Sequence, residues 1–430
     1  MVKIQAIRGT KDILPNELQY WQFIHNKVST LLECANYQEI RTPIFENSDL
    51  YDRSIGKNTD IVNKEMYRFY DRSKRDITLR PEGTAGIVRA FIENQMNYHN
   101  SLQRLWYSGP MFRYERPQSG RQRQFHQLGI EFIGSLDARA DTEVIHLAMS
   151  IFSNLNLTDL KLDINSIGNM EDRSLFEAKL QDYLTRYYDE LDTDSKKRLI
   201  NNPIRILDSK NVNIQKILSD APKISNFLSL KSQKHFDTVC NYLQLLNIPY
   251  NINEKLVRGL DYYNDTAFEI KTLTSKGQDT VCGGGRYDSL VQQLGGIETP
   301  AVGCAIGLER LLLLAKENIV LPNRYIDFYI ATKGEKANKA GMQIMHFLHQ
   351  KFFKIEIDMS SNNFGKQIKQ ANKKRAIACI IIGNDEVEQG KITIKWMLSQ
   401  QQEDMTLMQF KHKLSYLKKK ILFYKSVTGY

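Results

Sequence analysis

Cysteine is scarce in this sequence, and its few copies lie far apart. The 430 residues contain five cysteines, an odd number, and no two of them form a CxxC pair. This pattern indicates neither a disulfide framework nor a zinc site, so we expect reduced thiols in a reducing compartment. The cysteines are Cys34, Cys240, Cys282, Cys304 and Cys379.

Long hydrophobic runs are also lacking. No apolar stretch approaches the roughly 18 residues that a membrane span requires. The start of the chain, Met1 to Asp12, has neither an apolar signal core nor an Arg/Ser-rich amphipathic stretch, so we expect no targeting peptide. These absences predict a cytoplasmic protein, or one of an organelle's stroma or matrix if the gene lies in that organelle.

What the chain does contain is typical of a globular protein of two or three domains, with 42% hydrophobic and 25% charged residues. Its net charge of +10 is unevenly spread. From Arg324 to Tyr430 there are 19 Lys and Arg against 9 Asp and Glu, whereas the first 323 residues balance at 40 of each. The surplus favours a polyanion-binding module at the C-terminal end, although a solvated basic surface is the simpler alternative.

The order of predicted elements separates a long body, a helical segment and a final α/β segment. Apolar residues recur at helical spacing from Glu17 to Ala35, and Gln38 to Phe45 is strand-like, with Pro43 confining it to an edge or a bend. Residues 170–240 are polar and helical. From residue 325 strands and helices alternate as β-α-β-α-β, which predicts a parallel sheet covered by helices.

The most informative segment runs from Phe112 to Glu131 and reads F-R-Y-E-R-P-Q-S-G-R-Q-R-Q-F-H-Q-L-G-I-E. Apolar flanks predict two strands joined by an arginine-rich loop. Guanidinium groups held on a strand suit the capture of a phosphate at a fixed position, because the planar fork is preorganised and always charged. The alternatives are a solvated basic hairpin or one that grips RNA without chemistry. The arginines are Arg113, Arg116, Arg121 and Arg123.

A loop at Thr78–Thr84, T-L-R-P-E-G-T, presents Glu82 and Thr84 beside a Pro-Gly turn. A carboxylate and a hydroxyl in this position could receive a substrate ammonium group. Spacing alone favours a simpler role, in which the two residues cap the helix predicted over Ala85 to Asn94.

Residues 256–263, L-V-R-G-L-D-Y-Y, place Arg258 on a glycine-flanked loop before two tyrosines. On a strand, Tyr262 and Tyr263 would point to opposite faces, so one of them could face a pocket. The alternative is a surface arginine beside a packed tyrosine pair.

Two glycine-containing segments follow. Val281–Asp288, V-C-G-G-G-R-Y-D, is a strand or turn whose three glycines by themselves indicate only close backbone packing. Ala301–Leu311 reads as a strand that leads into a helix at Gly307. There Glu309 and Arg310 could form a salt bridge at the start of the helix.

Together these segments resemble one family. Phe112–Glu131 resembles the second signature motif of class II aminoacyl-tRNA synthetases, and its end, R-Q-F-H-Q-L-G-I-E, resembles the histidyl-tRNA synthetases in particular. L-V-R-G-L-D-Y-Y and the triple-glycine segment resemble two signatures of that family. Ala301–Leu311 resembles the third class II motif, but its glycines fall at Gly303 and Gly307, which leaves the role of Gly303 open.

The resemblance implies a site for histidine. Glu131 and Tyr263 would take the two imidazole nitrogens, and leaving both unsatisfied would discriminate against phenylalanine or leucine. The loop 78–84 and Gln127 would receive the α-ammonium group. The implied histidine-binding residues are Glu82, Gly83, Thr84, Gln127, Glu131, Tyr262 and Tyr263.

Sites for ATP and tRNA are implied as well. Arg113 and Arg258, the implied catalytic residues, would bind the α-phosphate, and Arg310 would lie over the γ-phosphate. Mg²⁺ would accompany the β- and γ-phosphates, with protein ligands that the sequence does not identify. The acceptor end of the tRNA would meet Arg116, Gln118, Arg121 and Arg123.

For the whole chain, the resemblance implies an α+β class II catalytic domain, built on an antiparallel sheet flanked by helices, over residues 1–169 and 246–322. A helical insertion would occupy 170–245, and an α/β anticodon-binding domain 323–430. The protein would be a homodimer, with Glu17–Phe45 at its interface, that ligates L-histidine to tRNA(His) through a histidyl-adenylate.

Two rival interpretations differ in class. One is a catalytically inactive regulatory relative, such as the subunit that activates ATP phosphoribosyltransferase or the uncharged-tRNA sensor of a stress kinase. Such proteins usually lose the motif arginines or the L-V-R-G-L-D-Y-Y segment, and this chain keeps both. The other is a class II enzyme for a different amino acid, which would not combine Glu131 with Tyr263.

Overall fold

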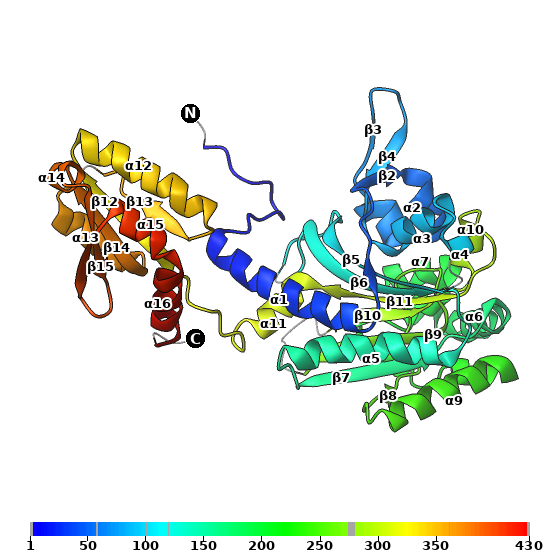
Figure 1. The fold of residues 1–430 in the computed structure, drawn as a ribbon. Coiled ribbons are helices and arrows are strands. Elements are labelled where there is room, and N and C mark those ends of the chain that lie inside the picture. Colours follow the sequence, from blue (N-terminus) through cyan, green and yellow to red (C-terminus); the bar gives the residue numbers. More distant parts are fainter. Residues whose placement is uncertain are drawn as a thin grey trace. The chain divides into compact units, whose positions relative to one another are not determined.

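The computed structural model describes residues 3–56, 59–99, 102–118, 120–273, 280–360 and 362–427. The chain divides into two compact units, Met1–Ile319 and Val320–Tyr430, whose helices and strands are labelled in Figure 1. Within the described ranges, no helix is both long and apolar enough to cross a membrane.

An eight-stranded sheet forms the centre of the first unit, with the strand order β1-β5-β6-β11-β10-β9-β7-β8. Neighbouring strands run antiparallel except for β1 with β5 and β7 with β8 at the two edges. The predicted antiparallel sheet is therefore confirmed for its centre. The strands are β1 (Gln38–Glu39), β5 (Gln103–Phe112), β6 (Gln124–Ile133), β7 (Leu160–Ser166), β8 (Asn251–Ile252), β9 (Asn264–Thr272), β10 (Thr280–Arg286) and β11 (Ala301–Gly307).

Strand pairing brings the sequence motifs together. β5 and β6 form the predicted hairpin, and β6 pairs with β11 so that Glu131 lies opposite Gly303. β11 in turn pairs with β10, where Gly303 lies opposite Gly285. The arginine-rich and glycine-rich segments, more than 150 positions apart in the sequence, are thus neighbours in one sheet.

Helices α1 (Pro15–Cys34), α5 (Ala138–Asn154) and α11 (Leu308–Ala315) pack on one another and on the sheet (Figure 1). α1 starts with a proline in its first turn, where no backbone N–H is required, and buries Ile24, Val28 and Leu32 at helical spacing. α5 begins after Asp137, whose side chain accepts a hydrogen bond from the backbone N–H of Arg139.

The prediction of one continuous strand over Gln38–Phe45 is wrong, because the structure has two short strands there. Its first residues form β1 of the large sheet, and its last residue begins β2 (Phe45–Asn47) of a separate three-stranded sheet. Pro43 lies in the bend between them, because it has no N–H to contribute to a ladder. The small sheet also contains β3 (Arg68–Tyr70) and β4 (Asp76–Leu79), and α2 (Ser48–Ser54), α3 (Thr84–Glu93), α4 (Met96–His99) and α10 (Leu290–Gln293) complete this region of the unit.

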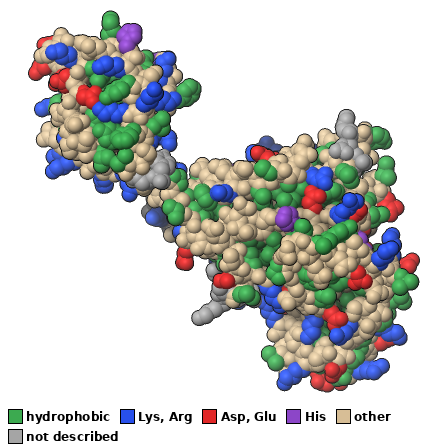
Figure 2. Space-filling view, turned by 60° about the horizontal axis from the view of Figure 1, so that its bottom comes forward, with side chains coloured by type: hydrophobic (Ala, Val, Ile, Leu, Met, Phe, Trp, Pro, Cys, Tyr) green, Lys and Arg blue, Asp and Glu red, His purple; other side chains and the backbone are tan. Residues whose placement is uncertain are grey.

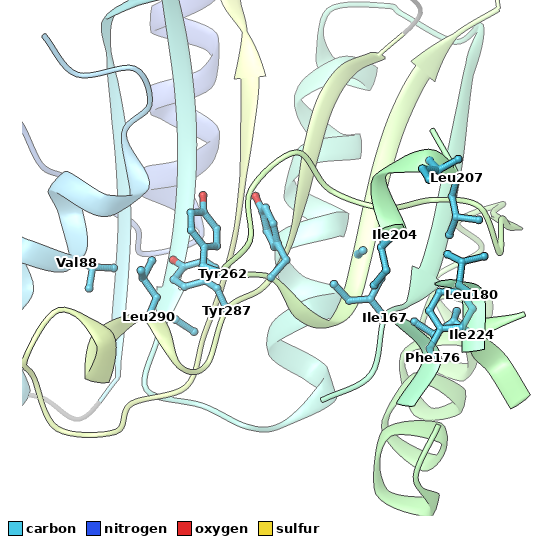
Figure 3. Close-up of a cluster of buried hydrophobic side chains, with 14 of the residues drawn as sticks. Val88, Ile167, Phe176, Leu180, Ile204, Leu207, Ile224, Tyr262, Tyr287 and Leu290 are labelled. Atoms are coloured by element: carbon cyan, nitrogen blue, oxygen red, sulfur yellow. The ribbon is translucent and has the colours of Figure 1, made fainter. Parts of the chain in front are cut away.

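The segment predicted to be a helical insertion joins β7 to β8. All of residues 170–245 are described, and they form helices and connecting turns without a strand. The buried apolar side chains from Phe176 to Ile224 belong to the same apolar cluster as Val88 and Tyr262, so this part of the segment and the sheet share a core (Figure 3). The helices are α6 (Met170–Thr185), α7 (Thr193–Asn201), α8 (Val212–Ile217) and α9 (Leu230–Leu245).

The second unit is built on a five-stranded sheet of order β13-β12-β14-β15-β16. The three predicted strands, β12, β13 and β14, are parallel as expected, but β15 and β16 add an antiparallel hairpin that was not predicted. The elements are β12 (Ile326–Lys333), α12 (Glu335–Gln350), β13 (Ile355–Ile357), α13 (Phe364–Lys373), β14 (Ala376–Gly383), α14 (Asn384–Glu388), β15 (Lys391–Trp396), β16 (Gln402–Thr406), α15 (Leu407–His412) and α16 (Leu414–Val427).

The charge surplus of the second unit is visible on its surface. In the face shown in Figure 2, Lys and Arg side chains are spread among apolar ones, and few acidic groups interrupt them. Such a distribution suits a backbone of many phosphates better than one small anion.

Candidate active site

A pocket of about 210 Å³ opens in the first unit, and five of the sequence motifs line it. The loop before α3 supplies Glu82 and Thr84, and the β5–β6 hairpin supplies Arg113 and Gln127. The other lining residues are Glu115, Gly120, Arg121, Gln122, Phe125, Arg258, Leu260, Tyr262, Tyr263, Thr280, Val281, Cys282, Gly283, Ala305, Gly307, Glu309 and Arg310.

Each of the three predicted phosphate-binding arginines is anchored to the protein through part of its guanidinium. Arg113 Nε donates to the carbonyl oxygen of Pro81 at 2.9 Å, and Arg258 Nη1 donates to Glu269 Oε1 at 2.6 Å. Arg310 donates through Nε to the carbonyl of Gly120 and through Nη1 to that of another residue, Thr280. The three side chains come from separate stretches of sequence and line the same pocket.

These cations affect one another. The pKa of Arg310 is lowered from its usual value, first by burial and then by the nearby positive charges of Arg121 and Arg113, whereas Glu115 opposes the shift. A site in which like charges are held together in this way favours an anionic ligand, because the anion relieves the repulsion.

Glu82 has the capping role that spacing alone favoured. Its carboxylate accepts hydrogen bonds from the backbone N–H groups of Thr84 at 2.6 Å and Ala85 at 2.8 Å, so it caps the start of α3. It also lines the pocket. Burial raises the pKa of Glu82, and the two backbone hydrogen bonds counteract this.

Gln127 lines the pocket near this carboxylate and offers an acceptor. Within the described residues, its buried Oε1 has no hydrogen-bond partner. A buried carbonyl oxygen without a partner carries a desolvation cost of about 1–3 kcal/mol. A ligand with N–H donors would remove that cost.

The two tyrosines differ from the prediction in their local structure. Tyr262 and Tyr263 lie in a turn before β9 rather than on a strand, and both line the pocket. Their ring centroids are 4.7 Å apart. Burial raises the pKa of Tyr263 to about 12, so its phenol keeps its proton at neutral pH and can donate it in a hydrogen bond.

Two predicted histidine-binding residues lie behind the pocket wall. Glu131 is fully buried and accepts hydrogen bonds from Thr84 Oγ1 at 2.7 Å and from the hydroxyl of Tyr287 at 2.5 Å. Burial raises its pKa to about 8. Gly83 faces Tyr107, since a Cβ on this glycine would lie 2.2 Å from that ring.

Gly303, whose role the sequence left open, makes room for Glu131. The two residues are opposite each other on β11 and β6. A Cβ at position 303 would lie 1.7 Å from Glu131 Oε2. Atoms cannot approach this closely, so any larger residue at 303 would force the carboxylate to move.

The four predicted tRNA-contacting residues lie in different surroundings. Arg116 and Gln118 are exposed on the loop between β5 and β6. Arg121 lines the pocket and pairs with Glu115 at 3.2 Å. Arg123 is half-buried, and its guanidinium lies 3.9 Å from the ring centre of Tyr114, outside the residues that line the pocket.

Sequence reasoning did not identify the contacts of two carboxylates, Glu309 and Glu269. Glu309 accepts hydrogen bonds from the backbone N–H of His126 and contacts its ring Nδ1 at 2.9 Å, so it joins α11 to β6 rather than pairing with Arg310. Glu269 binds Arg258. The available signal was a glutamate between the apolar residues Phe268 and Ile270 of β9, where a half-buried acid favours a cationic partner.

The chain is similar to known proteins along its whole length. Residues 9–311 match the family model described as Histidyl-tRNA synthetase, and residues 327–417 match the one described as Anticodon binding domain. "Histidine--tRNA ligase, chloroplastic" of Pyropia yezoensis is 81% identical over 430 residues, which is all of both chains. "Histidine--tRNA ligase" of Microcystis aeruginosa is 52% identical over 99% of this chain and 100% of the relative. The solved structure of apo histidyl-tRNA synthetase from S. aureus, 37% identical, matches with a TM-score of 0.79 over 98% of this chain and 100% of that one.

Proposed function

Because this chain belongs to the histidyl-tRNA synthetase family, we propose that the pocket of its first unit is the site at which histidine is activated by ATP. The protein catalyses the ATP-dependent attachment of histidine to tRNA(His), through a histidyl-adenylate and with release of pyrophosphate and AMP. The observation that carries the assignment of the site is the convergence of Arg113, Arg258 and Arg310 beside the two tyrosines.

In the first step, the carboxylate of histidine attacks the α-phosphorus of ATP in line, and pyrophosphate leaves. Two anions must approach each other, so cations fixed in advance lower the barrier. We assign Arg113 and Arg258 to the α-phosphate and Arg310 to the phosphate tail. A general base is not required, because the attacking carboxylate is already ionised.

The α-ammonium group of histidine is assigned to Glu82, Thr84 and Gln127. Glu82 supplies negative charge, and the unpartnered Oε1 of Gln127 supplies an acceptor within the described part of the pocket. Gly83 contributes indirectly, because its small size lets the loop pack against Tyr107.

The imidazole ring is assigned to Tyr263, whose protonated phenol can donate to one ring nitrogen, with Tyr262 packed beside it. Glu131 is the proposed partner of the other nitrogen. Each of its two oxygens already accepts one hydrogen bond, from Thr84 or from Tyr287, and each keeps a further acceptor position for a ring N–H.

Mg²⁺ is proposed to accompany the β- and γ-phosphates, where it neutralises charge on the leaving pyrophosphate. The described residues contain no cluster of three or more metal-binding side chains. This fits an ion held mainly by the nucleotide's own oxygens, since Mg²⁺ commonly binds with only one or two protein carboxylates. Glu115 and Glu309 are the lining carboxylates beside the arginines that could serve it.

Partner contacts remain proposals of the same kind. The tRNA acceptor end would meet Arg116, Gln118, Arg121 and Arg123, among which the exposed pair is best placed for a first contact. The anticodon would be bound by the second unit. A homodimer built around α1 and an organelle stroma are proposed from the family and from the chloroplastic relative.

ATP–pyrophosphate exchange tests the assignment. Among the twenty standard amino acids, we expect only histidine to support exchange, because Tyr263 and Glu131 together require a ring with two nitrogens. Exchange supported equally by proline or threonine would overturn the assignment. Absence of exchange with every amino acid would favour the inactive regulatory relative instead.

A further inference from the structure

The guanidinium of Arg258 is held in the pocket by an acid that none of the signature motifs contains. We propose that Glu269 is a positioning residue for adenylate formation, which fixes the fork of Arg258 at the α-phosphate. This inference rests on the proposed role of Arg258.

The direct contact is an ion pair between half-shielded groups. Arg258 Nη1 lies 2.6 Å from Glu269 Oε1, and the two side chains are only 16% and 18% exposed. On its other side, the guanidinium lies over the ring of Tyr263, with 5.4 Å between its carbon and the ring centre. The fork is therefore held by a carboxylate and by an aromatic face.

The sheet register places Glu269 next to the space that the guanidinium of Arg258 occupies. Glu269 on β9 lies opposite Gly283 on β10. A Cβ at position 283 would lie 2.3 Å from Arg258 Nη2, so the glycine leaves the space that the guanidinium occupies. The triple-glycine segment thus has a specific reason for one of its glycines, namely access of Arg258 to Glu269.

Further contacts hold the carboxylate itself. Glu269 Oε2 accepts a hydrogen bond from Thr280 Oγ1 at 3.1 Å and pairs with Lys271 Nζ at 3.3 Å. Lys271 also pairs with Asp163 at 3.0 Å. Charges of alternating sign therefore run across β7 and β9 to the pocket, and these contacts limit the rotation of the Glu269 side chain.

If this ion pair served stability alone, we would expect all buried donors of the guanidinium to have hydrogen-bond partners in the protein. Here the guanidinium still has donors to offer. Within the described residues, the buried Nε of Arg258 has no hydrogen-bond partner. A guanidinium with five N–H donors that is bound by the protein at Nη1 and not at Nε, within the described residues, can bind a further acceptor.

A double-mutant cycle tests the proposal on the full-length protein. Glu269→Gln keeps the shape of the side chain and removes its charge, and we expect the kcat of histidine-dependent pyrophosphate exchange to fall about 10–100-fold. In an Arg258→Met background, the same substitution should cost less than about threefold, because its effect passes through the arginine. Glu143→Gln is the matched control, since it breaks an Arg–Glu pair of the same type, with Arg104 Nε at 2.8 Å, that does not line the pocket.

Either of two results would overturn the proposal. One is unchanged kcat in Glu269→Gln, and the other is an equal loss in both backgrounds, which would mean that Glu269 acts independently of Arg258. If Glu269→Gln does not fold, Glu269→Asp takes its place in the same cycle. Aspartate keeps the negative charge but moves it away from Arg258, and the same criteria apply. Wild-type exchange with histidine, measured alongside, separates failure of this inference from failure of the proposed function.

Discussion

At the scale of single residues, the pocket is organised around three arginines whose side chains are already held by hydrogen bonds to the protein. Arg113, Arg258 and Arg310 each donate hydrogen bonds to protein acceptors, and all three residues line the pocket. A charge held in this way does not have to reorganise when a reacting phosphate arrives, which is the main source of electrostatic catalysis.

Arg258→Ala should lower the rate of adenylate formation about 100-fold or more, because it removes a charge assigned to the transition state. Stability should change little, since Glu269 keeps Lys271 and Thr280 as partners. Exchange kinetics and thermal unfolding of the same preparation would measure both. A large fall in melting temperature with normal turnover would assign Arg258 a structural role.

Glu131 should make stability depend on pH. Its folded pKa of about 8 lies above the usual value of 4.5, so the native state binds the proton more tightly than the unfolded state. Its contribution is complete below about pH 4.5 and is lost as the pH rises through about 8, at up to about 1.4 kcal/mol per pH unit. The free energy of unfolding of the wild type minus that of Glu131→Gln should therefore fall between pH 5 and 8. A difference that stays constant would show that burial does not shift this carboxyl.

At the scale of elements, the sequence predicted most of what positions the pocket. The β5–β6 hairpin, the strand and helix that meet at Gly307, and the helical segment 170–245 follow from hydrophobic pattern and turn residues. The turn that carries Tyr262 and Tyr263 does not, because a short apolar run looks the same in a turn and in a strand.

Two other features depend on contacts that the sequence does not display. The β15 segment alternates between buried and less buried positions, but β16 reads Q-E-D-M-T, and its Gln, Glu and Asp residues weaken the strand signal of the hairpin. Glu131 lies behind the pocket wall because Gly303 leaves space there, and that space exists only once β6 and β11 are paired.

Gly303→Ala tests this packing between strands. The added Cβ would collide with Glu131 Oε2 and with the carbonyl oxygen of Ile130, so we expect a loss of about 1–3 kcal/mol together with reduced use of histidine. Gly365→Ala in α13 is the control, since the nearest atom to its Cβ would be 3.7 Å away and alanine favours a helix. Chemical denaturation compares the two. Equal stabilities would show that the sheet opens at little cost.

At the scale of the whole molecule, the distribution of charge along the chain matches the division into two units. The first 323 residues balance their charges, and the positive surplus lies in the remainder, which matches an anticodon-binding family. The chemistry of activation and the attraction of a polyanion are therefore assigned to different units.

This division predicts different responses to salt. Raising potassium chloride from about 50 to 200 mM should increase the KM for tRNA(His) in aminoacylation at least about tenfold. The reason is that dissolved cations compete with basic side chains for the phosphates of the tRNA, which lowers its affinity. Pyrophosphate exchange, which needs no tRNA, should change less than about twofold. Parallel losses in both assays would mean that salt acts on the pocket or on folding.

The carbonyl of Gly120, which receives Arg310 Nε, belongs to the same hairpin loop that is proposed to meet the acceptor end of tRNA. On these proposed roles one short piece of backbone would serve both half-reactions, and displacement of the loop by an arriving tRNA would also loosen Arg310 beside the departing pyrophosphate. The order of activation and transfer would then depend in part on the hydrogen bond between Arg310 and this loop.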